Sequence, residues 1–137
     1  MEYLIGVLLG LVVAGGAALI GFDRERVFYP AVLIVVASYY VLFAVMGASS
    51  GILIVEIVAA SAFVLLAILG FKKSPWIVAA GLVGHGVFDF GRLGHIHNPG
   101  VPSFWPGFCM SIDVFLGAWL AVLLWRRSHA SLNSGEP

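Results

Sequence analysis

The chain has very few charged residues and a single cysteine. Only 10% of its 137 residues are Asp, Glu, Lys or Arg, whereas soluble globular domains carry about 25%. Seven basic and seven acidic side chains cancel, so there is no basic surface for nucleic acid, and we exclude nucleic acid as a partner. The lone Cys109 excludes an intramolecular disulfide and any CxxC metal or redox motif.

Hydrophobic residues, by contrast, make up 61% of the chain, and the mean hydropathy is +1.07. About 20 apolar residues in a helix cross the hydrocarbon core of a bilayer. The first run follows the acidic flank Met1-Glu2-Tyr3 rather than the basic flank of a signal peptide, so we expect a retained helix. We predict an all-α polytopic bundle of about five spans, at residues 3–22, 27–47, 51–71, 75–91 and 104–125. It forms one domain, 1–128, followed by a disordered cytoplasmic tail, 129–137.

The basic residues predict the orientation of these spans. If five helices alternate in direction, six basic residues fall on one side of the membrane and only Arg92 falls on the other. Because basic residues concentrate in cytoplasmic loops, we expect the amino terminus outside and the carboxyl terminus in the cytoplasm. The six residues are Arg24, Arg26, Lys72, Lys73, Arg126 and Arg127.

Four ionisable residues lie inside the predicted spans: Glu56, His85, Asp89 and Asp113. A charged side chain at the centre of a bilayer costs roughly 2.5–3.5 kcal/mol on insertion scales, so such residues indicate function. Counted along the helices, all four lie roughly 3–12 Å below the outer boundary. We therefore expect three helices to bring them to one site in the outer half of the membrane.

The outer loop adds a His-x-His pair, His95 and His97. In an extended backbone, residues i and i+2 point to the same side. Histidines with a carboxylate and an open position for water are typical of catalytic zinc and non-haem iron sites. We therefore predict that His85, Asp89, His95 and His97 hold a divalent metal.

The leading functional hypothesis is a membrane-embedded, metal-assisted enzyme that acts at the outer leaflet. Glu56 or Asp113 serves as its general base. Arg92, the single outer basic residue, binds an anionic group such as a lipid phosphate. Tyr39 and Tyr40, in the outer part of the second span, complete the predicted contacts with a small-molecule or lipid ligand.

The same residues also fit other functions. In a small oligomeric transporter or a proton or ion conductor, the carboxylates and His85 form a relay, although the inner half of the bundle has almost no polar residues. In an accessory subunit of a larger membrane complex, the pair Gly6 and Gly10 packs against the partner; the pair also fits packing inside the bundle or a homo-oligomer. Structural hydrogen bonding between helices is a further alternative. Copper bound through Cys109 and Met110 is less favoured than zinc or iron.

One part of the sequence resembles a known group of proteins. The segments His97-Asn98-Pro99 and Trp105-Pro106-Gly107-Phe108-Cys109, followed by Asp113, resemble a pattern in small bacterial membrane proteins of unknown function. The resemblance covers the last two spans and the loop between them. It implies a multi-pass protein of the bacterial inner (plasma) membrane, and it implies no activity, cofactor or catalytic residue.

Overall fold

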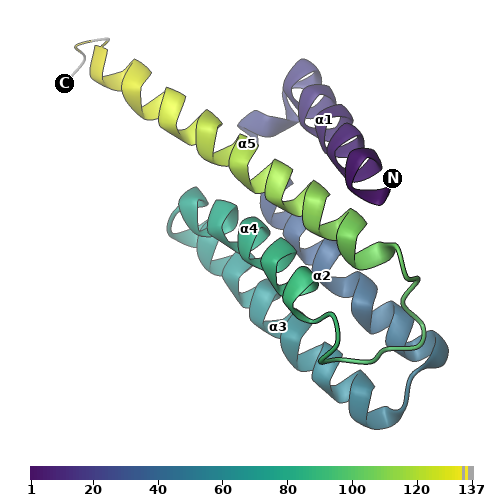
Figure 1. Cartoon of the computed structure of the whole chain (residues 1–137). Coiled ribbons are helices and arrows are strands. Elements are labelled where there is room, and N and C mark those ends of the chain that lie inside the picture. The colour runs from purple at the N-terminus through teal and green to yellow at the C-terminus, as the bar shows by residue number, and fades with distance from the viewer. Residues whose placement is uncertain (134, 136–137) are drawn as a thin grey trace.

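The structure, a computed structural model, describes residues 1–133 and 135. Within these residues the chain forms α-helices and no strand, which confirms the predicted all-α class (Figure 1). The helices are α1 (Glu2–Ile20), α2 (Phe28–Gly47), α3 (Ser50–Lys72), α4 (Pro75–Gly91) and α5 (Trp105–Asn133), with a short 3-10 turn, η1 (Phe22–Arg24), after α1.

Four of the helices, α1, α2, α3 and α5, are long and apolar enough to cross a membrane. Four such helices indicate a multi-pass membrane protein. The fifth helix, α4, has 17 residues and is the shortest, and its bounds are those predicted from the sequence. It is also central, because it packs against both α3 and α5.

Short-range signals in the sequence set several helix ends. Gly21 ends α1 in the left-handed conformation, with φ of +91°, which favours glycine. Ser49 caps α3 by accepting a hydrogen bond from the backbone nitrogen of Ile52. Ser74 caps α4 in the same manner, and Pro75 occupies the first helical position, where its missing N–H costs little.

The helix α5 continues to Asn133, into the stretch 129–137 that we expected to be a disordered tail. Residues 129–133 are therefore helical, and residues 134, 136 and 137 lie outside the described residues. The tail is polar, but a helix that has already formed can extend by one backbone hydrogen bond per residue without burying apolar side chains. The ring of His129 packs one turn above that of Trp125, with centroids 4.6 Å apart, and this contact supports the extension.

Consecutive helices run in opposite directions, so connections alternate between the two ends of the bundle (Figure 1). One end carries the turn between α2 and α3 and the loop 92–104 between α4 and α5; we call it the loop end. The amino terminus lies there too, because a Cβ placed on Gly107 at the start of α5 would be 3.0 Å from the ring of Tyr3. The opposite end carries η1, the turn between α3 and α4 and the end of α5.

The helix α1 packs mainly on α5, through the Gly6 and Gly10 pair. A Cβ on Gly10 would lie 2.8 Å from the ring of Phe115, and one on Gly6 would overlap the side chain of Ser111. The two glycines therefore let α1 and α5 approach closely, which is the packing role inside the bundle that small residues serve in membrane proteins.

Candidate functional site

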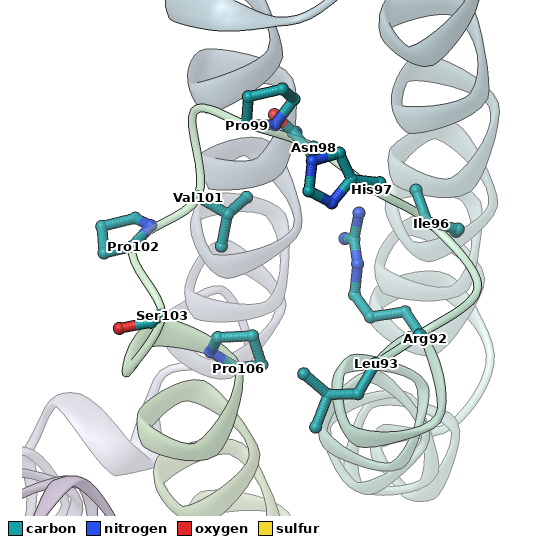
Figure 2. A pocket seen from close by; sticks show the side chains of 11 residues that line it. Arg92, Leu93, Ile96, His97, Asn98, Pro99, Val101, Pro102, Ser103 and Pro106 are labelled. Atoms are coloured by element: carbon teal, nitrogen blue, oxygen red, sulfur yellow. The ribbon is translucent and has the colours of Figure 1, made fainter.

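The loop 92–104 folds over the loop end and lines an open pocket of about 330 Å³ (Figure 2). All the residues that line it come from the stretch 92–106. The loop packs closely against α2 at Gly100. A Cβ added to Gly100 would overlap the backbone carbonyl of Phe43. The pocket is therefore fixed against the end of α2.

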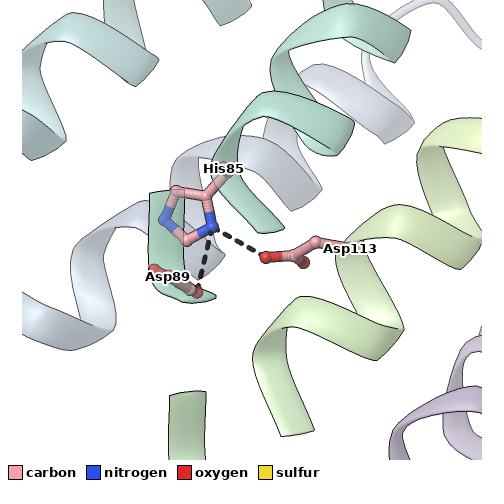
Figure 3. Close-up of side chains that lie close together, drawn as sticks. All are labelled: His85, Asp89 and Asp113. Carbon is pink, nitrogen blue, oxygen red and sulfur yellow. Dashed lines mark hydrogen bonds and ion pairs between the residues drawn. The ribbon is translucent and has the colours of Figure 1, made fainter. Parts of the chain in front are cut away.

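Deeper in the bundle, His85, Asp89 and Asp113 converge (Figure 3). The imidazole Nδ1 of His85 lies 2.7 Å from Oδ2 of Asp113 and 3.5 Å from Oδ2 of Asp89. Each residue offers a donor atom, and these three atoms lie within 4.8 Å of one another. In the described part of the chain, no other group of three or more His, Cys, Asp or Glu side chains has this arrangement.

The convergence depends on the close contact between α4 and α5. A Cβ on Gly86 would lie 2.9 Å from the backbone oxygen of Met110 and 3.3 Å from the Cβ of Asp113. One helical turn further along α5, a Cβ on Gly117 would lie 2.9 Å from the backbone oxygen of Ala79. Because each helix presents a glycine to the other, Asp113 of α5 reaches the imidazole on α4.

The carboxylates of this group retain unused acceptors. Among the described residues, neither oxygen of Asp89 has a hydrogen-bond partner, nor does Oδ1 of Asp113. Both residues are fully buried, at 0% exposed. A buried polar atom without a hydrogen-bond partner costs about 1–3 kcal/mol, and a charged one costs more. A bound cation would satisfy these oxygens, so the arrangement favours a positively charged ligand.

The donor set fits a transition metal. One imidazole and two carboxylates are N and O ligands used by zinc and non-haem iron. Ligand atoms about 2.0–2.2 Å from a metal lie roughly 3.0–3.5 Å from each other in octahedral or tetrahedral geometry. The distances of 2.7 and 3.5 Å from Nδ1 of His85 to the two carboxylates are close to that range.

A second polar group lies next to the first, toward the loop end. The guanidinium of Arg92 donates a hydrogen bond from Nη2 to Oε1 of Glu56. The amide of Asn98 donates to the same oxygen at 3.0 Å and to the backbone oxygen of Tyr40 at 3.3 Å. The guanidinium also lies 3.8 Å from the centroid of the Tyr40 ring, a cation–π distance. These contacts tie the loop to α2 and α3.

The two groups share a small cavity of about 10 Å³. Its walls include Tyr40, Glu56, Phe63, His85 and Arg92. A cavity needs roughly 10–15 Å³ to hold one water, so this one is large enough for about a single molecule. The cavity is therefore lined by the imidazole of the first group and by Glu56 and Arg92 of the second.

The buried charges do not balance. With all three carboxyl groups ionised, Glu56, Asp89 and Asp113 contribute three negative charges and Arg92 one positive charge, which leaves −2 when His85 is neutral. Uncompensated charge in an apolar interior is very costly. One divalent cation, or two additional protons on the group, brings the total to zero.

The structure brings some of the predicted site residues together and leaves others apart. His85, Asp89 and Asp113 form one group, and Glu56, Arg92 and Tyr40 form the adjoining one. Three residues lie outside both: Tyr39 packs on the ring of Trp105, and His95 and His97 are exposed in the loop. Metal binding by these two histidines stays a prediction. Asp113, predicted as a general base, lies among the possible ligands.

Asn98 was not among the predicted site residues, although it is buried and connects the loop to Glu56 and Tyr40. A local signal was present. Asn in front of Pro-Gly favours a turn in which the Asn side chain accepts from the backbone two residues on. The Oδ1 of Asn98 accepts such a bond from the nitrogen of Gly100 at 3.1 Å, which orients the amide NH2 toward Glu56.

Comparison with protein-family models, with curated proteins and with solved structures found no match to this chain. The functional argument therefore rests on the residues and on their geometry.

Proposed function

We propose that the protein is a membrane-embedded metalloenzyme that holds one divalent cation, zinc or iron, between His85, Asp89 and Asp113. The observation that carries the proposal is the meeting of one imidazole nitrogen and two carboxylates within 4.8 Å, with three carboxylate oxygens that have no hydrogen-bond partner among the described residues. The charge of the surrounding residues supports it, because a divalent cation neutralises the excess of −2 described above.

The neighbouring residues supply the other parts of such a site. When bound, the cation would lower the pKa of a water or polarise a substrate oxygen. Glu56 lines the one-water cavity beside His85, and its Oε2 has no hydrogen-bond partner in the described structure. In the proposed mechanism this oxygen accepts the proton of the water as general base. Arg92 and Asn98 hold the carboxylate of Glu56 in place.

The proposal includes five spans with the loop end outside the cell. At 1.5 Å per residue the 17 residues of α4 extend about 26 Å, close to the hydrocarbon thickness of a bilayer. The alternating helices place Arg24, Lys72 and Arg127 at the end opposite to Arg92, in agreement with cytoplasmic positive charge. The proposal also keeps the inner (plasma) membrane as the location, which is what the sequence resemblance implies.

The test is the metal content of the purified protein. After incubation with Zn²⁺ or Fe²⁺ and removal of free metal, mass spectrometry should find about one metal per wild-type chain. The Asp89→Asn/Asp113→Asn variant should lose it, because amides replace charged ligands of similar shape. His95→Ala/His97→Ala tests the two loop histidines that the sequence predicts as ligands: retention of the metal restricts the site to His85, Asp89 and Asp113, and loss of the metal adds the loop histidines to it. A wild-type protein that retains neither metal would refute the proposal.

A proton or ion relay is the second candidate function. The observation that favours it is the continuous series of ionisable side chains from the loop-end pocket through Arg92 and Glu56 to His85. Such intramembrane series are typical of proton pathways. Proton flux into liposomes that falls in Glu56→Gln and in Asp113→Asn would support a relay, and flux equal to that of empty liposomes would exclude it.

A further inference from the structure

The loop-end pocket has the chemistry of an anion site. Among the described residues that line it are the cation Arg92, which is also paired with Glu56, and the imidazole of His97, and none of these lining residues is Asp or Glu. Three prolines, Pro99, Pro102 and Pro106, form part of its wall, and the fixed φ angles of Pro99 and Pro102 stiffen the loop. Its volume of about 330 Å³ is at the lower end of the range of roughly 300–1,000 Å³ for small-molecule pockets.

Arg92 is the residue that points to a ligand. Its side chain is 3% exposed, and one of its terminal nitrogens, Nη2, donates to Glu56. The other, Nη1, is buried and has no hydrogen-bond partner among the described residues. A guanidinium carries five N–H donors, and a buried charged donor without an acceptor is costly. Arg92 and His97 both line the pocket, and Figure 2 draws the guanidinium and the imidazole close together in that view.

We propose that this pocket binds a phosphate group, held by Arg92 and His97. Arginine is suited to phosphate because its planar fork can donate two parallel hydrogen bonds. The pocket lies at the end of the apolar spans, where the phosphates of lipid headgroups lie, and it has room for a small alcohol esterified to the phosphate. The source is therefore a phospholipid headgroup or a soluble phosphate monoester.

The inference deepens the proposed function by naming the class of substrate. Arg92 lines both the loop-end pocket and the one-water cavity that reaches His85. A phosphate bound on Arg92 would therefore contact a side chain that also lines the cavity of the water that Glu56 would deprotonate. Only the assignment as substrate rests on the proposed function; the pocket itself contains none of the three proposed metal ligands, so phosphate binding and metal binding are measured separately.

The experiment measures phosphate binding to metal-free protein in phosphate-free detergent. Equilibrium dialysis is performed with inorganic phosphate and with glycerol 3-phosphate, and native mass spectrometry follows lipid retained from nanodiscs of phosphatidylglycerol or phosphatidylcholine. The variants are His97→Ala and the charge-neutral pair Glu56→Gln/Arg92→Gln. His95→Ala is the matched control, because His95 is exposed in the same loop and does not line the pocket.

Phosphate binding should weaken roughly tenfold or more in Glu56→Gln/Arg92→Gln and by a smaller factor in His97→Ala. His95→Ala should bind phosphate as the wild type does. Strong binding of soluble phosphates identifies a soluble ester, and retained phosphatidylglycerol with weak soluble binding identifies a lipid headgroup. Absence of binding in both arms, or equal binding by the wild type and the Glu56→Gln/Arg92→Gln variant, would overturn the inference. A folded protein that binds metal but no phosphate would refute phosphate binding and leave the proposed metal site intact. A folded protein that binds phosphate but no metal would refute the metal site and leave phosphate binding intact.

Discussion

Gly86 lies where α4 touches α5 beside the candidate site, and replacing it with alanine should separate the two helices. The added Cβ would lie 2.9 Å from the backbone oxygen of Met110 and from a methyl group of Val114. A backbone oxygen cannot rotate away as a side chain can, so α5 must shift. The shift moves Asp113 away from His85, because Asp113 lies on the face of α5 that contacts Gly86. The Cβ of Asp113 would be 3.3 Å from the added Cβ.

The expected cost can be separated from helix propensity by a second variant. Gly84 lies on the same helix, is exposed, and has no atom within 4 Å of a Cβ placed on it. Gly84→Ala and Gly86→Ala gain the same intrinsic propensity, up to about 1 kcal/mol. The difference between them therefore reports the clash alone, which for overpacking is about 1–3 kcal/mol.

The assay is reversible unfolding in mixed micelles, followed by tryptophan fluorescence, with zinc affinity measured by competition with a chelator. Gly86→Ala should unfold at lower denaturant than Gly84→Ala and bind zinc roughly tenfold or more weakly, which corresponds to about 1.4 kcal/mol. If the two alanine variants have the same stability and the same zinc affinity, then close packing of α4 on α5 does not position Asp113, and the reasoning fails.

Three further predictions concern the loop end and the orientation. In unfolding experiments, Arg92→Gln should cost about 3–5 kcal/mol, because it leaves the buried carboxylate of Glu56 without a counter-charge and with only the amide of Asn98 as donor. Glu56→Gln/Arg92→Gln should cost less than that single change, and a larger cost for the double variant would contradict the pairing. Cys109 is 2% exposed, so it should react with a water-soluble maleimide only after unfolding, and rapid labelling of folded protein would count against its burial. In a cysteine-free background, His95→Cys should label in intact cells, whereas Ser128→Cys should label only after the membrane is opened; the opposite pattern would reverse the proposed orientation.

Much of the fold could be predicted because membrane helices are marked by long apolar runs with recognisable ends. The bounds of α4 were predicted to the residue, since Ser74 and Pro75 mark its start and Gly91 precedes a charged residue. The end of α5 was not predicted, because the polar residues after Trp125 lack the apolar signal that identifies a span. Stable helix formation in that stretch depends on the preceding turns rather than on burial.

The candidate site was predictable within a helix and unpredictable between helices. The i,i+4 spacing of His85 and Asp89 fixes their common face from the sequence alone. Which carboxylate completes the group depends on the packing of α4 against α5, and Asp113 rather than Glu56 is the one that the structure places there. The pairing of Glu56 with Arg92 joins α3 to the loop after α4, across 36 residues, and no local pattern specifies such a contact.

The distribution of polar groups along the bundle also bears on the choice between binding and conduction. The ionisable clusters lie between the loop-end pocket and His85 near the middle of α4. Beyond them, the interior is filled by Leu33, Leu82 and Leu116, each at most 1% exposed, together with the other apolar residues of the core. A charge that reached His85 from the loop end would have to cross this layer unsolvated, at a cost of several kcal/mol. The single chain therefore suits a site that exchanges its ligand and its protons with one side of the membrane, which favours a one-sided metal centre over a pore.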